Sequence, residues 1–273
     1  MINLTKELET AIKACRNAGD YVAGQFSNYS GVKYKDKGIA TLVSDVDVEA
    51  EKMISDTLTN GFPDYSFYGE ESGVHPNDSP NMWVVDPLDG TNNFALGIPL
   101  IAVSVSLLRN GFPQLGVIYH PITKKLFYAE IGTGAFQDNR ILKSNDTKRN
   151  ERLTISLISG YAAVELAHRI HIKLAPNVKR IISTWSPGID YSLIANGDID
   201  IILSINSEIE DQIGGLVIAK ESGAVIKDVN GEDFWPSEFS EILPTNILAK
   251  DQETYTRFID ILNSTGAIEL INT

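Results

Sequence analysis

The sequence predicts a mixed α/β protein in two parts, one of helices and antiparallel strands and one of alternating strands and helices. Residues 101–139 form short alternating apolar runs between glycine and proline turns, which is typical of an antiparallel meander. From residue 153 onward, strand-like runs alternate with helical patterns over short connections. The polar stretch 143–152 separates the two patterns. We therefore expect two subdomains, residues 1–145 and 146–273, that form one compact unit.

Composition limits the function. The chain has 273 residues, of which 43% are hydrophobic, enough for a substantial core. It carries 23 Lys and Arg against 36 Asp and Glu, a net charge of −13, so we expect no nucleic-acid partner. The single cysteine, Cys15, excludes an internal disulfide and suits a reducing compartment. Residues 1–8 contain no long apolar run, so we expect a cytoplasmic protein without a signal peptide or membrane span.

The spacing of apolar and capping residues predicts the N-terminal helices and the strand that follows them. Apolar residues at helical intervals predict an amphipathic helix over residues 4–26, with Cys15 on its buried stripe as a core residue. Residues 27–41 are polar and turn-rich, and we expect a surface loop there. Ser44 can cap a second helix, and Asp47, three residues later, fits the acid of a capping box. A predicted strand at residues 65–68 runs into Glu70 and Glu71, which could be an ordinary surface pair.

Two acids follow the next strand. The apolar run 82–85 predicts a buried strand that stops at Asp86, and Asp89 comes three residues later. Pro87 fixes its own φ and biases Asp86 toward an extended conformation. Both carboxylates and the carbonyl of Leu88 can then turn toward one point, and such oxygens are the ligands that Mg²⁺ prefers. The alternative is a buried turn with two capping acids.

The residues after these acids favour an anion. Gly90 lets a ligand approach the backbone closely. Residues 91–93 are predicted to open a helix, whose free N–H groups attract negative charge. Metal ligands beside an anion site indicate phosphate ester chemistry.

This stretch resembles a known motif. The central motif of the inositol monophosphatase family of Mg²⁺-dependent sugar phosphatases runs Asp-Pro-(Ile/Leu)-Asp-Gly-Thr-x-Asn-Phe, and every fixed position is filled in Asp86-Pro87-Leu88-Asp89-Gly90-Thr91-Asn92-Asn93-Phe94. The resemblance implies a layered αβαβα sandwich of the sugar-phosphatase type, usually a homodimer. It also implies two or three Mg²⁺ ions and a small phosphate-ester substrate.

The resemblance implies a ligand set. Glu70, Asp86 and the Leu88 carbonyl would hold one ion, and Asp86, Asp89 and Asp211 the other. Asp211 lies in an incomplete match to the family's second motif, with Glu210 in place of tryptophan and Gly223-Ala224 in place of a glycine pair. Asp211 could instead cap a helix predicted over residues 209–221.

The resemblance also assigns catalytic roles. Thr91 and Asp47 would orient the attacking water, with Asp45 as the alternative to Asp47, and Glu71 would lie close by. The N–H groups of Gly90 and Thr91 would bind phosphate. Lys35 and Lys37, in the 27–41 loop, are candidates to approach the metals or are simply solvated.

In the C-terminal part, strands and helices are predicted to alternate. Strands are expected at residues 153–159, 178–184, 199–204, 225–229 and 247–250, and helices at about 161–173, 188–196, 209–221 and 252–264. His168 and His171 stand three apart on one predicted helix, but no third ligand lies near in sequence, so we interpret them as surface residues. No convincing Asp-His-Ser or Cys-His arrangement supports a protein nucleophile.

At the positions where the family contacts its substrate, this sequence carries different residues. Alignment on residues 193–197 places Trp185, Ser186 and Pro187 where the family carries Gly-(Ser/Thr)-Ala. The family's inositol-binding glutamate falls on Ser204, so a charge-assisted hydrogen bond is lost. We therefore predict poor selectivity for inositol phosphate, with a sugar bisphosphate or an aromatic ester hydrolysed as well or better. Glu208 or Asp190 could supply the missing acceptor instead.

The functional prediction is hydrolysis of a small phosphate monoester, inositol-phosphate-like or a sugar phosphate, by Mg²⁺-activated water. Alternatives within the superfamily are a fructose-1,6-bisphosphatase, a histidinol phosphatase and a 3′-phosphonucleotide phosphatase. A catalytically silent regulatory relative is the alternative of a different class.

Overall fold

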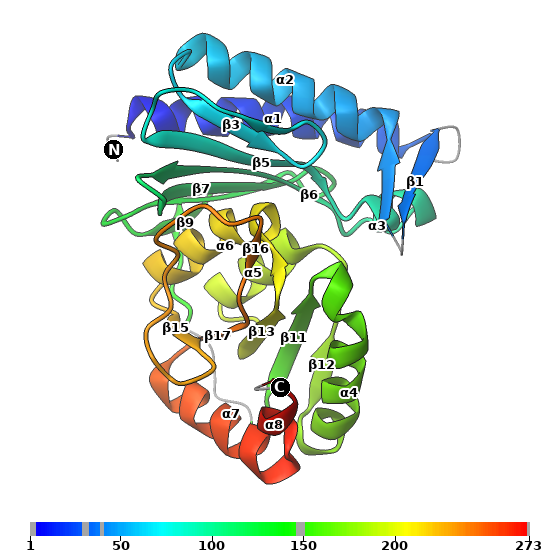
Figure 1. The fold of residues 1–273 in the computed structure, drawn as a ribbon, viewed down its shortest axis with the longest axis vertical. Coiled ribbons are helices and arrows are strands. Elements are labelled where there is room, and N and C mark those ends of the chain that lie inside the picture. The colour runs from blue at the N-terminus through cyan, green and yellow to red at the C-terminus, as the bar shows by residue number, and fades with distance from the viewer. Residues whose placement is uncertain (1–3, 29–32, 39–40, 146–150, 272–273) are drawn as a thin grey trace.

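The computed structural model describes residues 4–28, 33–38, 41–145 and 151–271, arranged in five layers (Figure 1). Helices α1 and α2 cover one face of a large sheet, and α5 and α6 lie between this sheet and a smaller one. Helices α4, α7 and α8 cover the outer face of the smaller sheet. This arrangement confirms the predicted αβαβα sandwich. The division into subdomains at residue 145 stays a prediction.

The first helical layer forms as predicted. Helix α1 (Lys6–Phe26) begins after Thr5, whose side chain accepts a hydrogen bond from Leu8 N. Cys15 is fully buried on the inner stripe of α1, and its thiol lies 3.4 Å from the Val103 carbonyl, which confirms its place in the core. Helix α2 (Asp45–Gly61) begins after Ser44, which forms the predicted capping box with Asp47.

The predicted 27–41 loop is wrong in part. Strands β1 (Tyr34–Gly38) and β2 (Thr41–Ser44) pair as an antiparallel hairpin, with Tyr34 opposite Ser44. Residues 41–43 combine a β-branched and apolar run, which favours a strand despite the polar residues before it. The side chains of Lys35 and Lys37 lie outside what the structure describes.

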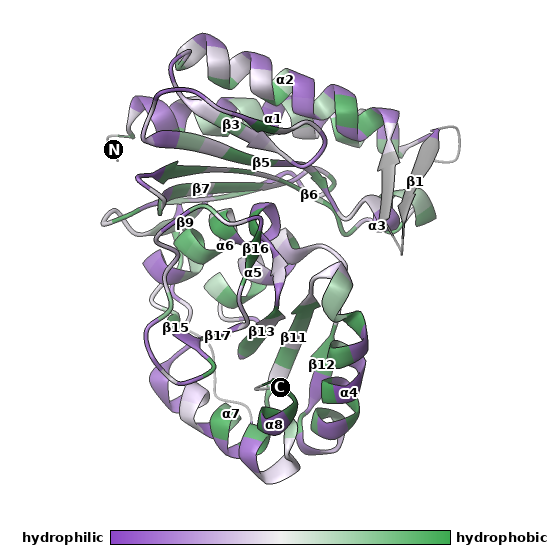
Figure 2. Ribbon diagram, in the orientation of Figure 1, coloured by the Kyte–Doolittle hydropathy of each residue, from purple (hydrophilic) through white to green (hydrophobic). Residues whose placement is uncertain are grey.

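The large sheet contains the predicted meander. Its strand order in the described chain is β10-β9-β8-β7-β6-β5-β3-β4, with β3 parallel to β5 and the other neighbouring pairs antiparallel. Its strands are β3 (Ser66–Gly69), β4 (Gly73–His75), β5 (Asn81–Asp89), β6 (Ala102–Arg109), β7 (Phe112–His120), β8 (Lys125–Glu130), β9 (Ala135–Gln137) and β10 (Arg140–Ile141). The short strand β4 was not predicted, because its three residues carry no periodic pattern. Figure 2 shows the central strands of both sheets as strongly hydrophobic.

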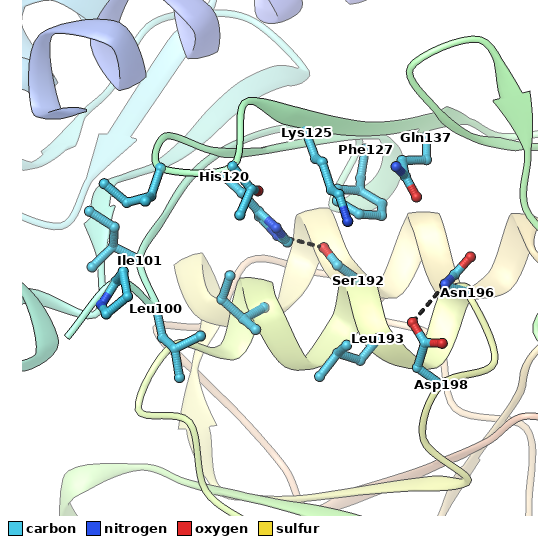
Figure 3. Close-up of a pocket in the computed structure, with 14 residues that line it drawn as sticks. Leu100, Ile101, His120, Lys125, Phe127, Gln137, Ser192, Leu193, Asn196 and Asp198 are labelled. Atoms are coloured by element: carbon cyan, nitrogen blue, oxygen red, sulfur yellow. Dashed lines mark hydrogen bonds between the residues drawn. The ribbon is translucent and has the colours of Figure 1, made fainter.

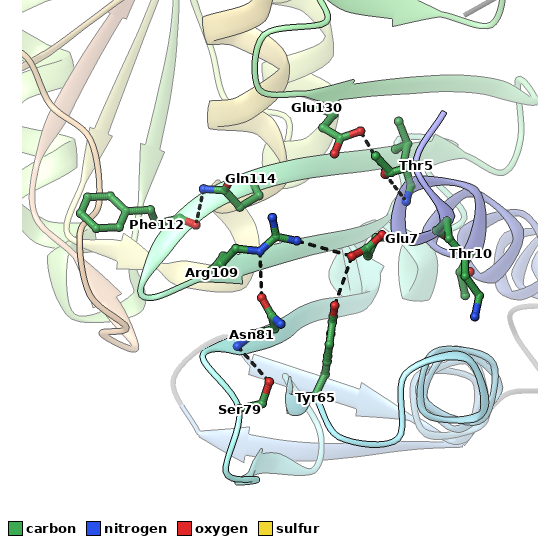
Figure 4. A network of polar contacts seen from close by, with 12 residues as sticks. Thr5, Glu7, Thr10, Tyr65, Ser79, Asn81, Arg109, Phe112, Gln114 and Glu130 are labelled. Carbon is green, nitrogen blue, oxygen red and sulfur yellow. Dashed lines mark hydrogen bonds and ion pairs between the residues drawn. The ribbon is translucent and has the colours of Figure 1, made fainter. Parts of the chain in front are cut away.

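A polar network joins the start of α1 to this sheet (Figure 4). Glu7 Oε1 accepts hydrogen bonds from Tyr65 Oη at 3.1 Å and from Arg109 Nη2 at 3.4 Å. Arg109 Nε also donates to Asn81 Oδ1 at 3.0 Å. The network therefore links α1 to the ends of β5 and β6, far from the strand end that carries Asp86 and Asp89.

The middle layer packs closely on the large sheet. Helix α6 (Ile209–Glu221) approaches β7 so tightly that a Cβ added to Gly116 would lie 2.2 Å from the Gly214 carbonyl oxygen. Helix α5 (Pro187–Ala195) contacts the end of β7, where His120 Nε2 lies 3.0 Å from Ser192 Oγ (Figure 3). These contacts fix both helices against β7, in the same sheet as the strand β5 that carries Asp86 and Asp89.

The smaller sheet has the strand order β12-β11-β13-β17-β15. Its strands are β11 (Thr154–Ser159), β12 (Arg180–Ile182), β13 (Ile201–Ile205), β15 (Val225–Asp228) and β17 (Asn246–Ala249). Strands β11, β12 and β13 are parallel, and β17 runs antiparallel to β13 and β15. All five were predicted, within a few residues at their ends.

The outer layer completes the fold. Helices α4 (Val164–Leu174), α7 (Gln252–Thr265) and α8 (Ala267–Ile271) pack with β11, β13 and β17 in one apolar cluster. Helix α8 and the short pair β14 (Ser207–Glu208) with β16 (Ile242–Leu243) were not predicted. Among the described residues, no helix has both the length and the apolar character needed to cross a membrane.

Candidate metal centre

The end of β5 carries the first two acids. Strand β5 pairs regularly with β6 up to Asp86, which faces Ser104, and the register then shifts before Asp89, which faces Ala102. Within the irregular stretch, Asp86 Oδ1 accepts a hydrogen bond from Leu88 N at 3.0 Å. The shift breaks the strand's two-residue alternation of faces, because an irregular residue pair re-aims the side chains beyond it. Asp86 and Asp89 can therefore share one side.

A third acid joins them from α6. Carboxylate oxygens of Asp86, Asp89 and Asp211 all lie within 4.8 Å of one another. Asp211 lies in the first turn of α6, whose N-cap is Glu208, so Asp211 does not occupy the capping position. Its Oδ2 accepts a long hydrogen bond of 3.4 Å from Ser207 Oγ. Asp211 thus stands in the cluster that the resemblance implied for it.

The cluster is electrostatically unfavourable as a set of carboxylates. Burial, followed by the negative charges of Glu70 and Asp89, raises the pKa of Asp86 well above its usual range. Burial and the charge of Asp89 likewise raise the pKa of Asp211. Burial raises the pKa of Asp89 to about 7, against two hydrogen bonds that favour its ionised form. A bound cation would relieve this repulsion and favour all three carboxylates.

The two carboxylate oxygens of Asp89 differ in their hydrogen bonds. Its Oδ2 accepts hydrogen bonds from Ser186 Oγ and from Gly188 N, both at 2.7 Å. Its Oδ1 is buried and accepts no hydrogen bond from any described residue. A buried carboxylate oxygen without a partner is costly unless another ligand satisfies it. The donor set, all oxygen and mostly charged, fits a hard divalent cation such as Mg²⁺.

Helix α5 supports this orientation. Ser186 is its N-cap, Pro187 and Gly188 begin its first turn, and Ser192 Oγ donates to the Gly188 carbonyl at 2.8 Å. Ser192 in turn contacts His120 on β7 (Figure 3). Burial lowers the pKa of His120 to about 4, so this imidazole is neutral at pH 7. The hydrogen bonds that hold Asp89 are therefore anchored in the large sheet.

Thr91 and Asp47 meet beside the cluster. Thr91 Oγ1 lies 2.7 Å from Asp47 Oδ1 and 3.0 Å from the Leu88 carbonyl oxygen. Asp47 Oδ2 accepts from Ser44 N at 2.9 Å and also contacts the Ser44 hydroxyl. Asp47 therefore caps α2 and contacts Thr91, so the two readings of this acid are compatible. The fallback, Asp45, is exposed at the start of α2.

The two glutamates after β3 differ in position. Glu70 lines the cavity described below, and its N–H donates to the Val85 carbonyl at 3.2 Å. Glu71 is not among the residues that line the cavity, and its N–H donates to Glu51 Oε2 at 2.8 Å. Sequence reasoning missed Glu51, a buried carboxylate that holds this turn. The signal was present, because Asp47 and Glu51 stand four apart on one face of α2.

Gly90 is required by its conformation and by space. It has φ +92° and caps α3 (Thr91–Leu96). A Cβ there would lie 2.9 Å from the Leu100 carbonyl oxygen and 3.2 Å from that of Trp185. The predicted helix after Gly90 exists but has only six residues.

A cavity of about 700 Å³ opens over the acids. The predicted residues Trp185, Ser186 and Pro187 line it, and so do the two alternative acceptors, Asp190 and Glu208. The predicted metal and phosphate residues that line it are Glu70, Asp86, Leu88, Asp89, Gly90, Thr91 and Asp211.

Ser204 does not reach this cavity. It is fully buried on β13 and is absent from the cavity lining. Alternate residues of β13 face opposite sides, and Ile202 belongs to the cluster around α5 and α6. Ser204 shares that side and interacts with Tyr191 of α5. The structure thus gives Ser204 no contact with the cavity, contrary to its expected role at the substrate.

Sequence reasoning also set aside two residues that line the cavity, His168 and His171 of α4. Their three-residue spacing was visible, but only the crossover from β11 brings α4 to the cavity. Glu210, which replaces the family's tryptophan, is buried beside Asp211 and interacts with Tyr68. Burial raises the pKa of Glu210 to about 7.

Comparisons of the sequence and of the fold with known proteins point to one family. The sequence model described as the inositol monophosphatase family matches residues 3–265. The chain is 32% identical over 231 residues to "Nus factor SuhB" of Xylella fastidiosa, covering 81% of this chain and 82% of that protein. It is 32% identical over 247 residues to the "Fructose-1,6-bisphosphatase/inositol-1-monophosphatase" of Aquifex aeolicus, covering 87% and 91%. The crystal structure of the extragenic suppressor protein suhB from Bartonella henselae matches with a TM-score of 0.84 and 28% identity, covering 97% and 98%.

Proposed function

Because the chain belongs to the inositol monophosphatase family, we propose that it is a Mg²⁺-dependent phosphatase that hydrolyses a small phosphate monoester. One observation carries the proposal. Asp86, Asp89 and Asp211 bring carboxylate oxygens within 4.8 Å of one another at the floor of a cavity. Their raised pKa values and the unpartnered Asp89 Oδ1 fit a site whose electrostatics are completed by a cation.

We assign the ligands as follows. Glu70, Asp86 and the Leu88 carbonyl would hold one ion, and Asp86, Asp89 and Asp211 would hold a second. When bound, Mg²⁺ neutralises phosphate charge and lowers the pKa of water. The number of ions, two or three, is open to direct measurement. The hydrogen bonds that Ser186 and Gly188 donate to Asp89 Oδ2 leave its Oδ1 available to an ion.

The nucleophilic water is oriented by Thr91 and Asp47. Asp47 Oδ2 is engaged by Ser44, so its Oδ1 remains for the Thr91 hydroxyl at 2.7 Å. When Thr91 donates its only proton to Asp47, the lone pairs of Thr91 Oγ1 are left to accept from water. Gly90 and Thr91 offer backbone N–H groups to the phosphate. The catalytic role expected of Glu71 stays a prediction; its N–H is held by Glu51 Oε2, at the turn that also carries Glu70.

The name "Nus factor" carried by the Xylella relative supports one other candidate, a regulatory partner without catalysis. Retention of Glu70, Asp86, Asp89, Asp211 and Thr91 favours catalysis. A phosphate-release assay with Mg²⁺ separates the two. The panel is inositol 1-phosphate, fructose 1,6-bisphosphate, histidinol phosphate and a 3′-phosphonucleotide. Release that stops with EDTA supports the phosphatase; no release from any ester at saturating Mg²⁺ supports the silent partner.

We also propose a cytoplasmic homodimer. Leu96, at the end of α3, and Ile98 and Leu100, which follow it, are exposed at the surface, and Leu96 is 67% exposed. A run of exposed apolar side chains is what a second subunit would cover. Light scattering gives the mass directly, and Leu96→Glu should shift a dimer toward monomer. A wild-type mass of one subunit at micromolar concentration would exclude the dimer.

A further inference from the structure

One wall of the cavity is apolar although its floor is acidic. This apolar wall comes mainly from β11, α4 and the segment before α5, and it consists of Leu157, Tyr161, Val164, Ala167, Ile172 and Trp185. Three of its side chains are large and well exposed: Tyr161 at 44%, Ile172 at 73% and Trp185 at 56%. Exposed apolar side chains gathered beside polar groups in a concave site indicate a binding surface.

The position of Trp185 is fixed by the metal centre. Trp185 has φ +57°, a left-handed conformation that tryptophan seldom adopts. The next residue, Ser186, binds Asp89, and the Trp185 carbonyl borders Gly90. Uncommon backbone conformations persist where the surrounding structure imposes them, often at binding sites. The indole is therefore attached at a fixed point immediately beside the acids and the proposed phosphate position.

The charges of the cavity disfavour a second phosphate. Among the described residues that line it, none is lysine or arginine, the side chains that bind phosphate as permanent cations. Their acidic side chains number six, namely Glu70, Asp86, Asp89, Asp190, Glu208 and Asp211. The basic side chains of this lining are only His168 and His171. Within the described lining, a sugar bisphosphate would thus bring its distal charge into a negative cavity without a lysine or arginine partner.

A polyol is also poorly matched. Each hydroxyl of an inositol ring needs a hydrogen-bond partner when it leaves water, and an unpaired one costs free energy. Beside this wall such a ring meets the Tyr161 hydroxyl, the Trp185 indole N–H, Ser159, Ser183 and the two imidazoles, while most of the wall's own surface is hydrocarbon or aromatic carbon. A flat, weakly polar ring has few hydrogen bonds to water to give up on such a surface, and it gains contact with the indole of Trp185.

We propose that the apolar wall is a subsite for a planar aromatic or heteroaromatic ring, so that the substrate is the phosphate monoester of a ring-bearing alcohol. The inference rests on the proposed phosphatase function and names the substrate class of the same site. The ring packs on Trp185 and the apolar side chains of α4, while the phosphate lies over the acids. His168 and His171 can both donate and accept hydrogen bonds, and they serve polar atoms at the ring's edge.

The test compares esters that differ in the ring. The probes are 2-phenylethyl phosphate and glycerol 2-phosphate, assayed with Mg²⁺ for the wild type and Trp185→Gly. Glycine suits φ +57°, so this variant keeps the backbone conformation and should fold. We expect kcat/KM for 2-phenylethyl phosphate to fall about tenfold, or about 1.4 kcal/mol, within reach of aromatic contacts. Glycerol 2-phosphate should change by less than about twofold.

Two further variants sharpen the result. Ile172→Ser removes an exposed apolar side chain from the same wall and should lower kcat/KM for the phenyl ester alone. Trp235→Ala is the matched control, because Trp235 lies under the Lys220 ammonium and away from the cavity lining. Trp235→Ala should leave the ratio of the two esters unchanged.

The outcomes separate this inference from the proposed function. If both esters are hydrolysed and Trp185→Gly affects them equally, the ring subsite is wrong and the phosphatase stands. If no ester is hydrolysed, the phosphatase is wrong, and calorimetry with 2-phenylethylphosphonate and ethylphosphonate still decides the subsite. Tighter binding of the phenyl compound that is lost in Trp185→Gly supports the subsite; equal binding of both compounds overturns it.

Discussion

Thr91 Oγ1 lies 2.7 Å from Asp47 Oδ1, so the capping-box acid of α2 touches the motif at the end of β5. The two residues are separated by 44 positions in sequence. Through Asp47 and Ser44, the start of α2 fixes the direction in which the Thr91 hydroxyl points. This contact joins the outer helical layer to the proposed catalytic water.

Thr91→Ala should therefore lower kcat far more than it weakens Mg²⁺ binding. Positioning groups of this kind contribute about 10²–10⁴-fold to rate. Thr91→Ser is the matched control, because serine keeps the hydroxyl, and it should retain most activity. Steady-state kinetics and calorimetric Mg²⁺ titration measure the two effects. A loss confined to Mg²⁺ affinity would instead make Thr91 a metal ligand.

Asp86→Asn should abolish turnover without lowering the stability of the metal-free protein. Asparagine is nearly isosteric, and it removes one charge from the repulsion among Glu70, Asp86 and Asp89. The free energy of unfolding in EDTA, from urea titration, should equal or exceed that of the wild type. Near-normal Mg²⁺-dependent turnover in Asp86→Asn would show that the ligand assignment is wrong.

The stability of the metal-free protein should fall as pH rises. The folded pKa of Asp89 is about 7, whereas a free aspartate has a pKa of about 3.9. Between these values the folded state binds more protons than the unfolded state, so the free energy of unfolding falls by about 1.4 kcal/mol per pH unit for one such group. Urea titrations in EDTA should therefore give higher stability at pH 5.5 than at pH 7.5.

Mg²⁺ should reverse this pH effect, because bound cations replace the protons and stabilise the folded state by mass action. Stability at pH 7.5 should rise on adding Mg²⁺, and less so in Asp89→Asn. Greater stability in EDTA at pH 7.5 than at pH 5.5 would contradict the account of the acids.

Gly116→Ala should destabilise the protein strongly. Its Cβ would meet the backbone of Gly214, which cannot move aside without shifting α6. Overpacking of this kind costs about 1–3 kcal/mol. Gly24→Ala is the control, since a Cβ there meets nothing within 4 Å; in helix α1 it should instead stabilise by about 0.5–1 kcal/mol. Equal effects of the two substitutions on urea unfolding would contradict the close packing of α6 on β7.

Much of the fold could be predicted because its signals are local. The helical stripe of α1 and the alternating strands β6 to β8 are patterns within single segments. The β14–β16 pair could not be predicted, because Ser207 and Leu243 pair across 36 positions without a periodic pattern in either strand. Strand β1 was predicted to be part of a loop because its residues, Tyr34–Gly38, are mostly polar and show no clear alternation.

The site residues also divide into those that local sequence predicts and those that only the tertiary structure brings to the cavity. Asp86 and Asp89 lie within one motif, so their proximity is a local property. Alignment placed Trp185 at the substrate, but the α4 part of the apolar wall and His168 were not recognisable from sequence, because α4 reaches the cavity only through the order of strands in the smaller sheet. Alignment placed Ser204 at the substrate, but the two faces of β13 decide which side chains can reach the cavity, and Ser204 lies on the buried one.

The most direct test of the central claim is the rate of phosphate release as a function of Mg²⁺ concentration, measured for the wild type and for Asp211→Asn. Asp56→Asn, an exposed acid of α2, is the control for a change of charge alone. The account predicts saturable Mg²⁺-dependent release by the wild type and Asp56→Asn, and almost none by Asp211→Asn. Release that is independent of Mg²⁺, or that survives in Asp211→Asn at the same Mg²⁺ concentration, would contradict it.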